Sequence, residues 1–220
     1  MKTSKAKKPR SERPRPDNSE ETALLGQGYS LIAGMDEAGR GPLAGPVVAG
    51  LIILPRSLSG PWLKDIRDSK VMTRIQREKV FGHLKEEALG FQSGAASALE
   101  IDELGIVPAT RLAMTRALNS LALMPQFLLL DAFPLPGVDI PQLAIVKGDA
   151  TCLSIAAASV VAKVTRDRMM EEFDEQFPGY GFAQNKGYGT GEHMRILDEL
   201  GPCPIHRFSF EPIKGSGATR

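Results

Sequence analysis

The sequence predicts an α/β fold, because short apolar runs typical of buried strands alternate with longer segments of helical periodicity. Three of these runs lead into acidic residues: the first into Asp36 and Glu37, the second into Asp131, and the third into Lys147-Gly148-Asp149. In open α/β sheets, binding sites form where strand ends line a common crevice. We therefore expect the four carboxylates to converge on one site.

Taken in order, the pattern predicts strands and helices whose ends are marked by caps, glycine or proline. Thr73 is the expected N-cap of a charged surface helix, Pro125 terminates the next helix, and Pro178-Gly179 ends the longest one. The predicted strands cover residues 30–35, 46–54, 91–98, 127–131 and 142–146, and the predicted helices cover residues 73–88, 108–123, 153–177 and 191–200.

The bulk composition is that of one soluble globular domain. The chain has 220 residues, of which 42% are hydrophobic and 24% charged, and its net charge is +1. Cys152 and Cys203 show no paired ligand spacing, which argues against a thiolate zinc site and for a reducing compartment. No apolar run approaches the roughly 18 residues of a membrane span. We expect a cytoplasmic monomer with no membrane partner.

The N-terminal segment has a different character, with seven Lys or Arg against one Glu in residues 1–16. We expect residues 1–27 to form a disordered basic tail, which is either a solvated leader or a weak ligand for phosphate backbones. A transit peptide is a third alternative. Residues 214–220 are expected to be frayed. The folded domain then covers residues 28–213, with a small helical C-terminal part over 178–213.

The stretch from Asp36 to Gly41 combines adjacent acids with bare backbone. Neighbouring strand residues point to opposite faces, so Asp36 and Glu37 serve one site only if the strand ends or bends, and Ala38-Gly39 permits a bend. Two hard oxygen ligands suit Mg²⁺ or Mn²⁺. Gly39 and Gly41 allow the backbone to approach a ligand closely. The alternative is an ordinary strand followed by a glycine turn with two solvated acids.

The other two acids also have local alternatives. Asp131 can start a turn toward Pro134, and Asp149 can cap the helix that follows. A carboxylate at the end of a buried strand is costly without a partner, and a divalent cation would satisfy all four acids together. We therefore favour a metal site.

The glycine- and tyrosine-rich loop over residues 179–190 is a second candidate for ligand contact. Tyr188 beside Lys186 can stack on a sugar or base while the amine meets a phosphate. Tyr180 and Phe182 are expected to fold onto the core instead. Asp167, between two arginines, is expected to be a surface ion-pair residue.

The chain resembles the bacterial type 2 ribonucleases H, the ribonuclease HII family, over residues 31–213. The resemblance implies an RNase H-like fold, in which helices flank a mixed sheet, with a small helical C-terminal region. Its blocks are Gly34 to Val48, Asp68-Ser69-Lys70, Lys147-Gly148-Asp149, Leu153 to Ser159 with Thr165-Arg166-Asp167, and Lys186-Gly187-Tyr188-Gly189-Thr190.

The resemblance also implies an activity and a site. The activity is hydrolysis of the RNA strand of RNA–DNA hybrids, and nicking on the 5′ side of a single ribonucleotide in duplex DNA to leave 3′-OH and 5′-phosphate ends. Gly39-Arg40-Gly41 reads the ribose 2′-OH, and Tyr188 packs against the sugar on the DNA side. Two Mg²⁺ or Mn²⁺ ions are held by Asp36, Glu37, Asp131 and Asp149. The candidate phosphate contacts are Arg40, Lys70, Lys147 and Lys186, and the alternative for each of them is a plain surface charge.

Some positions depart from the family pattern. Ala132 stands where glycine is usual, Thr151-Cys152 where Lys-Ser is common, and Asn185 where His is frequent, and Val71-Met72 replaces Lys-Leu. None of these changes removes a metal ligand. Two other classes remain: a catalytically silent nucleic-acid-binding domain, and a related metal nuclease of the same fold such as a junction resolvase.

Overall fold

The computed structural model describes residues 15–57 and 59–216 and shows a mixed five-stranded sheet in the order β3-β2-β1-β4-β5. β1, β2 and β3 pair antiparallel, whereas β4 and β5 run parallel to β1. The predicted α/β class and mixed sheet are confirmed. The strands are β1 (Ile32–Ala38), β2 (Val47–Ile53), β3 (Gly90–Ala96), β4 (Phe127–Asp131) and β5 (Gln142–Ile145).

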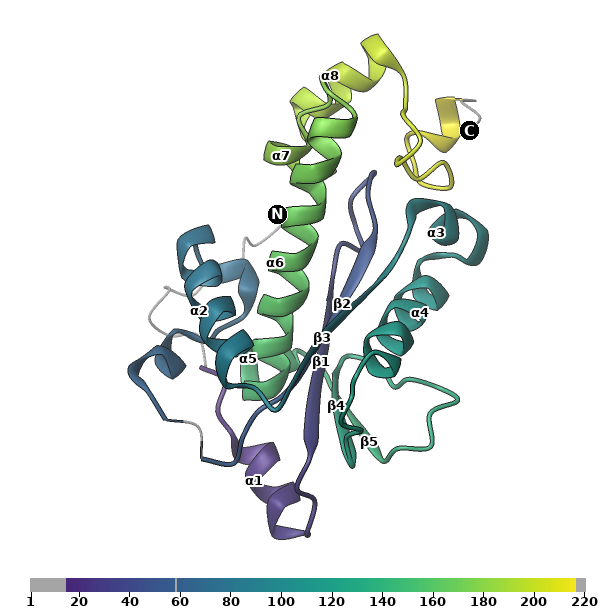
Figure 1. Ribbon diagram of the computed structural model, residues 1–220. Coiled ribbons are helices and arrows are strands. Elements are labelled where there is room, and N and C mark those ends of the chain that lie inside the picture. Colours follow the sequence, from purple (N-terminus) through teal and green to yellow (C-terminus); the bar gives the residue numbers. More distant parts are fainter. Residues whose placement is uncertain (1–14, 58, 217–220) are drawn as a thin grey trace, which may run out of the picture.

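Helices cover both faces of this sheet (Figure 1). α6 (Leu153–Gln176) and α2 (Arg74–Glu87) lie on one face, and α4 (Ile106–Asn119) packs on the other. α6 extends past the sheet to α7 and α8, as Figure 1 shows. The remaining helices are α1 (Ser19–Gly26), α3 (Ala98–Leu104), α5 (Gly148–Thr151), α7 (Phe182–Asn185) and α8 (Gly191–Leu200), with short 3₁₀ turns at Pro61–Asp65, Ser69–Val71 and Lys214–Ser216.

Small residues allow α6 to lie very close to the sheet. A Cβ on Gly34 would lie 2.2 Å from the carbonyl carbon of Ser154, and a Cβ on Gly50 would lie 2.3 Å from the carbonyl oxygen of Ala158. No larger residue fits either position without moving the helix. The start of α6, next to the ends of β1 and β4, is therefore held rigidly against the central strands.

One expectation about element ends is confirmed and one changes. Thr73 caps α2 as predicted, in a capping box with Gln76. β1, however, does not end at residue 35, because its ladder with β2 continues through Asp36↔Gly50 to Ala38↔Val48. The pairing partner, a fully buried strand, keeps β1 extended past its last apolar residue.

The expected disordered tail over residues 1–27 is wrong for its second half. Residues 19–26 form α1, and Leu24 is buried against Ile32, Leu129 and Ile155. The backbone of Asp17 pairs with the start of α6, donating to the Thr151 carbonyl at 3.0 Å and accepting from Leu153 N–H at 2.8 Å. Residues 1–14 lie outside the described part of the chain.

The C-terminal end is also more ordered than expected. Residues 214–216 form a 3₁₀ turn after the buried Ile213, while residues 217–220 lie outside the described part. Over the described ranges, 15–57 and 59–216, no helix is long and apolar enough to cross a membrane.

Candidate active site

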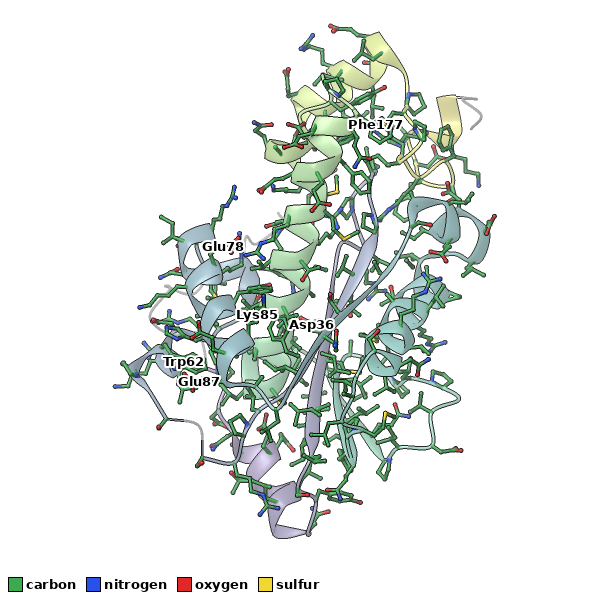
Figure 2. All side chains as sticks on the ribbon, viewed as in Figure 1. Asp36, Trp62, Glu78, Lys85, Glu87 and Phe177 are labelled. Carbon is green, nitrogen blue, oxygen red and sulfur yellow. The ribbon has the colours of Figure 1, made fainter. Side chains whose placement is uncertain are left out.

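Three of the four predicted carboxylates meet at one edge of the sheet. Asp36 comes from β1, Asp131 ends the neighbouring parallel strand β4, and Asp149 lies in α5, directly after β5. One oxygen of each lies within 4.8 Å of the others. Figure 2 shows Asp36 near the middle of the molecule, where β1 passes α6. The parallel pairing brings these acids together, because the carboxyl ends of parallel strands meet at the same edge.

The protein itself orients these carboxylates. Asp131 Oδ1 accepts a hydrogen bond of 2.8 Å from the backbone N–H of Gly148, and Asp36 Oδ1 accepts one of 2.7 Å from the N–H of Glu37. Lys70, from the 3₁₀ turn before α2, donates to Asp149 Oδ2 at 2.8 Å. Each acid therefore keeps at least one oxygen that can turn toward a shared cation.

The electrostatics of the cluster are unfavourable without a cation. Burial raises the pKa of Asp36 well above its usual value, and the charges of Glu37 and Asp131 raise it further. Burial and the charge of Asp149 likewise raise the pKa of Asp131. Burial alone would lower the pKa of Lys70, but its bond to Asp149 raises it, so Lys70 stays charged and offsets part of the repulsion. This set of hard oxygen donors fits Mg²⁺ or Mn²⁺.

Glu37 lies on the other face of β1, and the predicted bend between the two acids is absent. Its Oε1 accepts from Arg40 Nη1 at 3.3 Å, while its Oε2 is buried with no hydrogen-bond partner among the described residues. Burial raises the pKa of Glu37, and the charge of Asp131 adds to this although Arg40 opposes it. Glu37 nevertheless lies one residue before the end of β1 and is close enough to the cluster for the charge of Asp131 to act on it. Its role as fourth ligand stays a prediction, and it would have to reach the cluster from the end of the strand and not through a bend.

The glycine loop after β1 is shaped by two different requirements. Gly39 is buried with φ +95°, and a Cβ there would lie 2.1 Å from Arg166 Nε and 2.7 Å from the carbonyl oxygen of Pro46. Gly41, by contrast, is exposed, and a Cβ there would meet nothing within 4 Å. Gly39 is thus required by the fold, whereas Gly41 is free to serve a ligand.

Two buried arginines, neither of them predicted from the sequence to have a role, hold this loop. Arg207 donates to the carbonyl oxygens of Gly39, Arg40 and Gly45. Arg166 donates to the carbonyls of Ala44, Pro46 and Lys186 at 2.9 to 3.0 Å. Burial lowers the pKa of Arg166 to about 10 and that of Arg207 to about 9. Ala162, Arg166 and Met170 share one buried stripe of α6 at i, i+4 spacing, a pattern that could have identified Arg166.

The loop that carries Tyr188 is joined to the glycine loop. The carbonyl of Gly187 accepts from Leu43 N–H at 2.8 Å, and a Cβ on Gly187 would lie 2.3 Å from the Ala44 carbonyl oxygen. Tyr188 itself is 46% exposed, so its ring is available to a ligand. Tyr180 and Phe182 are buried and stacked, as expected.

The remaining charged residues named from the sequence, Lys147, Lys186 and Asp167, differ in exposure and in ion pairing. Lys147 is exposed with φ +60°. The Lys186 ammonium is bound to Glu171 at 2.8 Å, and its side chain is only 14% exposed. Asp167 is an ion-pair residue but not a surface one, because it is 14% exposed and pairs with Lys163 at 2.6 Å and Arg77 at 3.6 Å.

Comparison with known proteins agrees with this geometry. The family model described as Ribonuclease HII matches residues 33–213. A Ribonuclease HII of Dehalococcoides mccartyi is 51% identical over 200 residues, which cover 91% of this chain and 94% of the relative. The chain belongs to the ribonuclease HII family.

Solved structures show the same fold. The ribonuclease H2 from Pyrococcus horikoshii OT3 matches with a TM-score of 0.70 at 30% identity, over 84% of this chain and 96% of that one. Bst-RNase HIII in complex with Mn²⁺ matches with a TM-score of 0.59 at 18% identity, over 84% and 68% of the two chains. As a ribonuclease HII, the protein is a metal-dependent endoribonuclease that acts on RNA–DNA hybrids.

Two departures from the ribonuclease HII pattern have a structural consequence. Ala132 takes φ +62°, in the left-handed region where the usual glycine carries no strain. Asn185 fixes the Tyr188 loop, because its Oδ1 accepts from Gly187 N–H and its Nδ2 donates to the Tyr180 carbonyl, both at 2.7 Å. Among the described residues, the Thr151 hydroxyl makes only a long contact of 3.4 Å with the Lys147 carbonyl.

Proposed function

We propose that Asp36, Asp131 and Asp149, together with Glu37, hold two Mg²⁺ or Mn²⁺ ions at the scissile phosphate. The observation that carries the proposal is the approach of three carboxylate oxygens to within 4.8 Å of one another at the strand ends. The buried, unpartnered Oε2 of Glu37 supports the fourth assignment, because an orphaned carboxylate oxygen is costly unless a cation satisfies it. Bound divalent ions would activate a water for in-line attack and stabilise the departing 3′-oxygen.

The residues around this centre supply substrate selection. The carbonyls of Gly39 and Arg40 are occupied by Arg207, whereas among the described contacts none engages the N–H of Arg40 or Gly41. Those N–H groups are the natural donors to a ribose 2′-OH, which distinguishes RNA from DNA without reading a base. Tyr188, exposed beside this loop, would pack against the adjacent deoxyribose.

Four basic side chains are proposed to contact phosphates, and they differ in the ion pairs that they would first have to break. Lys147 is exposed and makes no ion pair among the described residues, whereas Lys70 would exchange Asp149 for a phosphate when a cation neutralises that acid. Arg40 would act similarly from its pair with Glu37. Lys186 would first have to leave Glu171, so its contribution should be the smallest. We further propose that the protein is a monomer acting in the cytoplasm, where its two buried free cysteines stay reduced.

The test is cleavage of duplex DNA that carries one ribonucleotide, with Mg²⁺ and then Mn²⁺, beside an all-DNA duplex. We expect wild type to nick on the 5′ side of the ribonucleotide and to spare DNA. Asp131→Asn should lose activity with both metals, whereas the exposed Asp139→Asn should not. Binding without cleavage would favour a silent hybrid-binding domain, and equal cleavage of DNA would favour another nuclease of this fold.

A further inference from the structure

Two fully buried histidines from the C-terminal part touch each other beside the Tyr188 loop. His193 comes from the first turn of α8, and His206 lies in the segment after that helix. Their Nε2 atoms are 3.1 Å apart. Neither residue is a metal ligand, and the proposed chemistry gives neither a task.

The contacts of the pair fix the direction of every hydrogen bond. His193 Nδ1 lies 2.9 Å from the carbonyl oxygen of Tyr188, so this nitrogen must carry the proton and donate. A neutral imidazole has one N–H, so His193 Nε2 accepts and His206 Nε2–H donates to it. His206 Nδ1 is then the acceptor, 2.9 Å from the N–H of Cys203 and farther, at 3.2 Å, from its carbonyl oxygen.

The chain of bonds closes only when both rings are neutral. A proton added to His193 Nε2 would face the Nε2–H of His206, and a proton added to His206 Nδ1 would face the N–H of Cys203. Burial, with the neighbouring His193, lowers the pKa of His206 to about 4, and burial also lowers that of His193. The directed pair is therefore intact at neutral pH.

Each histidine is bonded to one of the two segments that we propose to read the ribose, the loop that carries Tyr188 and the glycine loop after β1. The Tyr188 carbonyl is held by His193 and by Thr190 N–H at 2.8 Å. The backbone of His206 forms an antiparallel bridge with Ala44 of the glycine loop. The next residue, Arg207, binds the carbonyls of Gly39 and Arg40. The bond between the two rings thus links the segment that carries Tyr188 to the segment that holds the glycine loop.

Aromatic packing fixes the two rings in place. Phe182 meets His193 edge-on, with ring centroids 5.6 Å apart at 86°, and its centroid lies 5.5 Å from that of His206. Tyr180 covers His206 from 5.2 Å. A fully satisfied buried polar network of this kind rigidifies what it joins.

We infer that His193 and His206 are positioning residues for ribose recognition, their ring-to-ring hydrogen bond fixing Tyr188 relative to Gly39-Arg40-Gly41. The inference rests on the proposed role of Tyr188. It predicts that breaking the bond lowers cleavage by misplacing the tyrosine, over and above any loss of stability.

A matched pair of variants separates positioning from packing. His206→Gln places an amide N–H where Nε2–H was and keeps the donor to His193, whereas His206→Met has similar bulk and no donor. We expect His206→Met to lower kcat/KM for the single-ribonucleotide duplex about tenfold and His206→Gln to recover most of that loss, with similar Tm for the two. The control is His83→Gln in α2, where His83 stacks on Trp62, and we expect it to leave activity unchanged.

The decisive step repeats His206→Met in a Tyr188→Ala background. With no ring to position, the second substitution should cost less than about twofold in kcat/KM. Equal losses in both backgrounds, or parallel losses for Gln and Met that follow Tm, would overturn the inference while leaving the proposed site intact. If Tyr188→Ala alone leaves cleavage unchanged, the role of Tyr188 itself fails, and the inference falls with it.

A measurement on wild type covers the case in which these variants do not fold. Imidazole ¹⁵N spectra at neutral pH should show His193 as the Nδ1–H tautomer and His206 as the Nε2–H tautomer. The opposite tautomers, or a charged ring, would refute the directed bond.

Discussion

Neutralising one acid of the metal site should stabilise the cation-free protein while abolishing activity. Two full charges 4.8 Å apart repel by about 3.5 kcal/mol at an effective dielectric constant of about 20. Lys70, 2.8 Å from Asp149, offsets part of this, and the raised pKa of Asp36 limits its charge. We therefore expect Asp36→Asn to raise the free energy of unfolding by on the order of 1–3 kcal/mol. Each kcal/mol should raise Tm by roughly 2–4 °C in a chain of this length.

The assay is thermal unfolding at low salt with a chelator, followed by titration with Mg²⁺ or Mn²⁺. Wild type should gain stability as the cation binds, because binding to the folded state alone shifts the equilibrium, and Asp36→Asn should gain much less. Asp139→Asn, at an exposed position away from the cluster, controls for the change in net charge.

The pH dependence of stability is a second test of whether Asp36→Asn stabilises the cation-free protein. A carboxyl group whose pKa is raised on folding stabilises the native state at low pH, and this contribution is lost as pH rises through the folded-state value. The stability advantage of Asp36→Asn over wild type should therefore widen as pH rises above the ordinary range of carboxyl pKa values. A lower Tm for Asp36→Asn in chelator, or an equal rise for Asp139→Asn, would show that repulsion does not dominate the site.

Three further experiments test the surrounding structure. Gly41→Ala should keep the wild-type Tm and lower cleavage at a single ribonucleotide. Gly39→Ala should unfold at a lower temperature, because its Cβ would lie 2.1 Å from a buried guanidinium. Equal losses of Tm in the two variants would contradict this. Ala132→Gly should raise Tm by a few degrees, since it removes about 1 kcal/mol of left-handed strain, and an unchanged or lower Tm in a melting experiment would count against it. Glu21→Ala should cost about 1–2 kcal/mol in denaturant unfolding, because Glu21 accepts a 2.7 Å bond from a backbone N–H in the first turn of α6; Glu20→Ala is its control, and matching losses would exclude a capping role.

The carboxylate cluster could be predicted because its signal is local. Asp36 and Asp131 directly follow apolar runs, Asp149 follows one after two intervening residues, and parallel pairing of β1 and β4 is the common arrangement that brings such ends together. The position of Glu37 was harder to predict, because the strand was expected to bend where its apolar run stops. The ladder with β2 instead keeps β1 extended to Ala38, so alternation places the two acids on opposite faces.

The helix at residues 19–26 could not be predicted from composition. Its stability comes from contacts distant in sequence, namely Leu24 against the sheet end and Glu21 against α6. The charged and proline-rich residues before it dominated the sequence pattern of that region. A short helix that depends on tertiary packing leaves little signal in its own propensity.

Buried arginines are the other element that sequence patterns conceal, because arginine is normally exposed. Arg166 and Arg207 are buried because the glycine loop turns its carbonyls inward, where they need donors. That demand exists only after the loop, α6 and the C-terminal segment have come together. Arg207 could therefore be predicted only from the tertiary backbone, whereas Arg166 has a weak local signal in the buried i, i+4 stripe of α6.

The proposed catalytic and sugar-selecting roles therefore fall to different parts of the molecule. The carboxylates sit at strand ends backed by the large core on both faces of the sheet. The two loops that we propose to read the ribose are held by Arg166, Arg207 and the histidine pair, which pack with the smaller apolar cluster around Tyr180 and Phe182. Local opening favours regions with fewer buried contacts, so mild destabilisation should loosen substrate selection before it disturbs the metal ligands. Discrimination between RNA and DNA should accordingly fall at lower denaturant concentration than cation binding does.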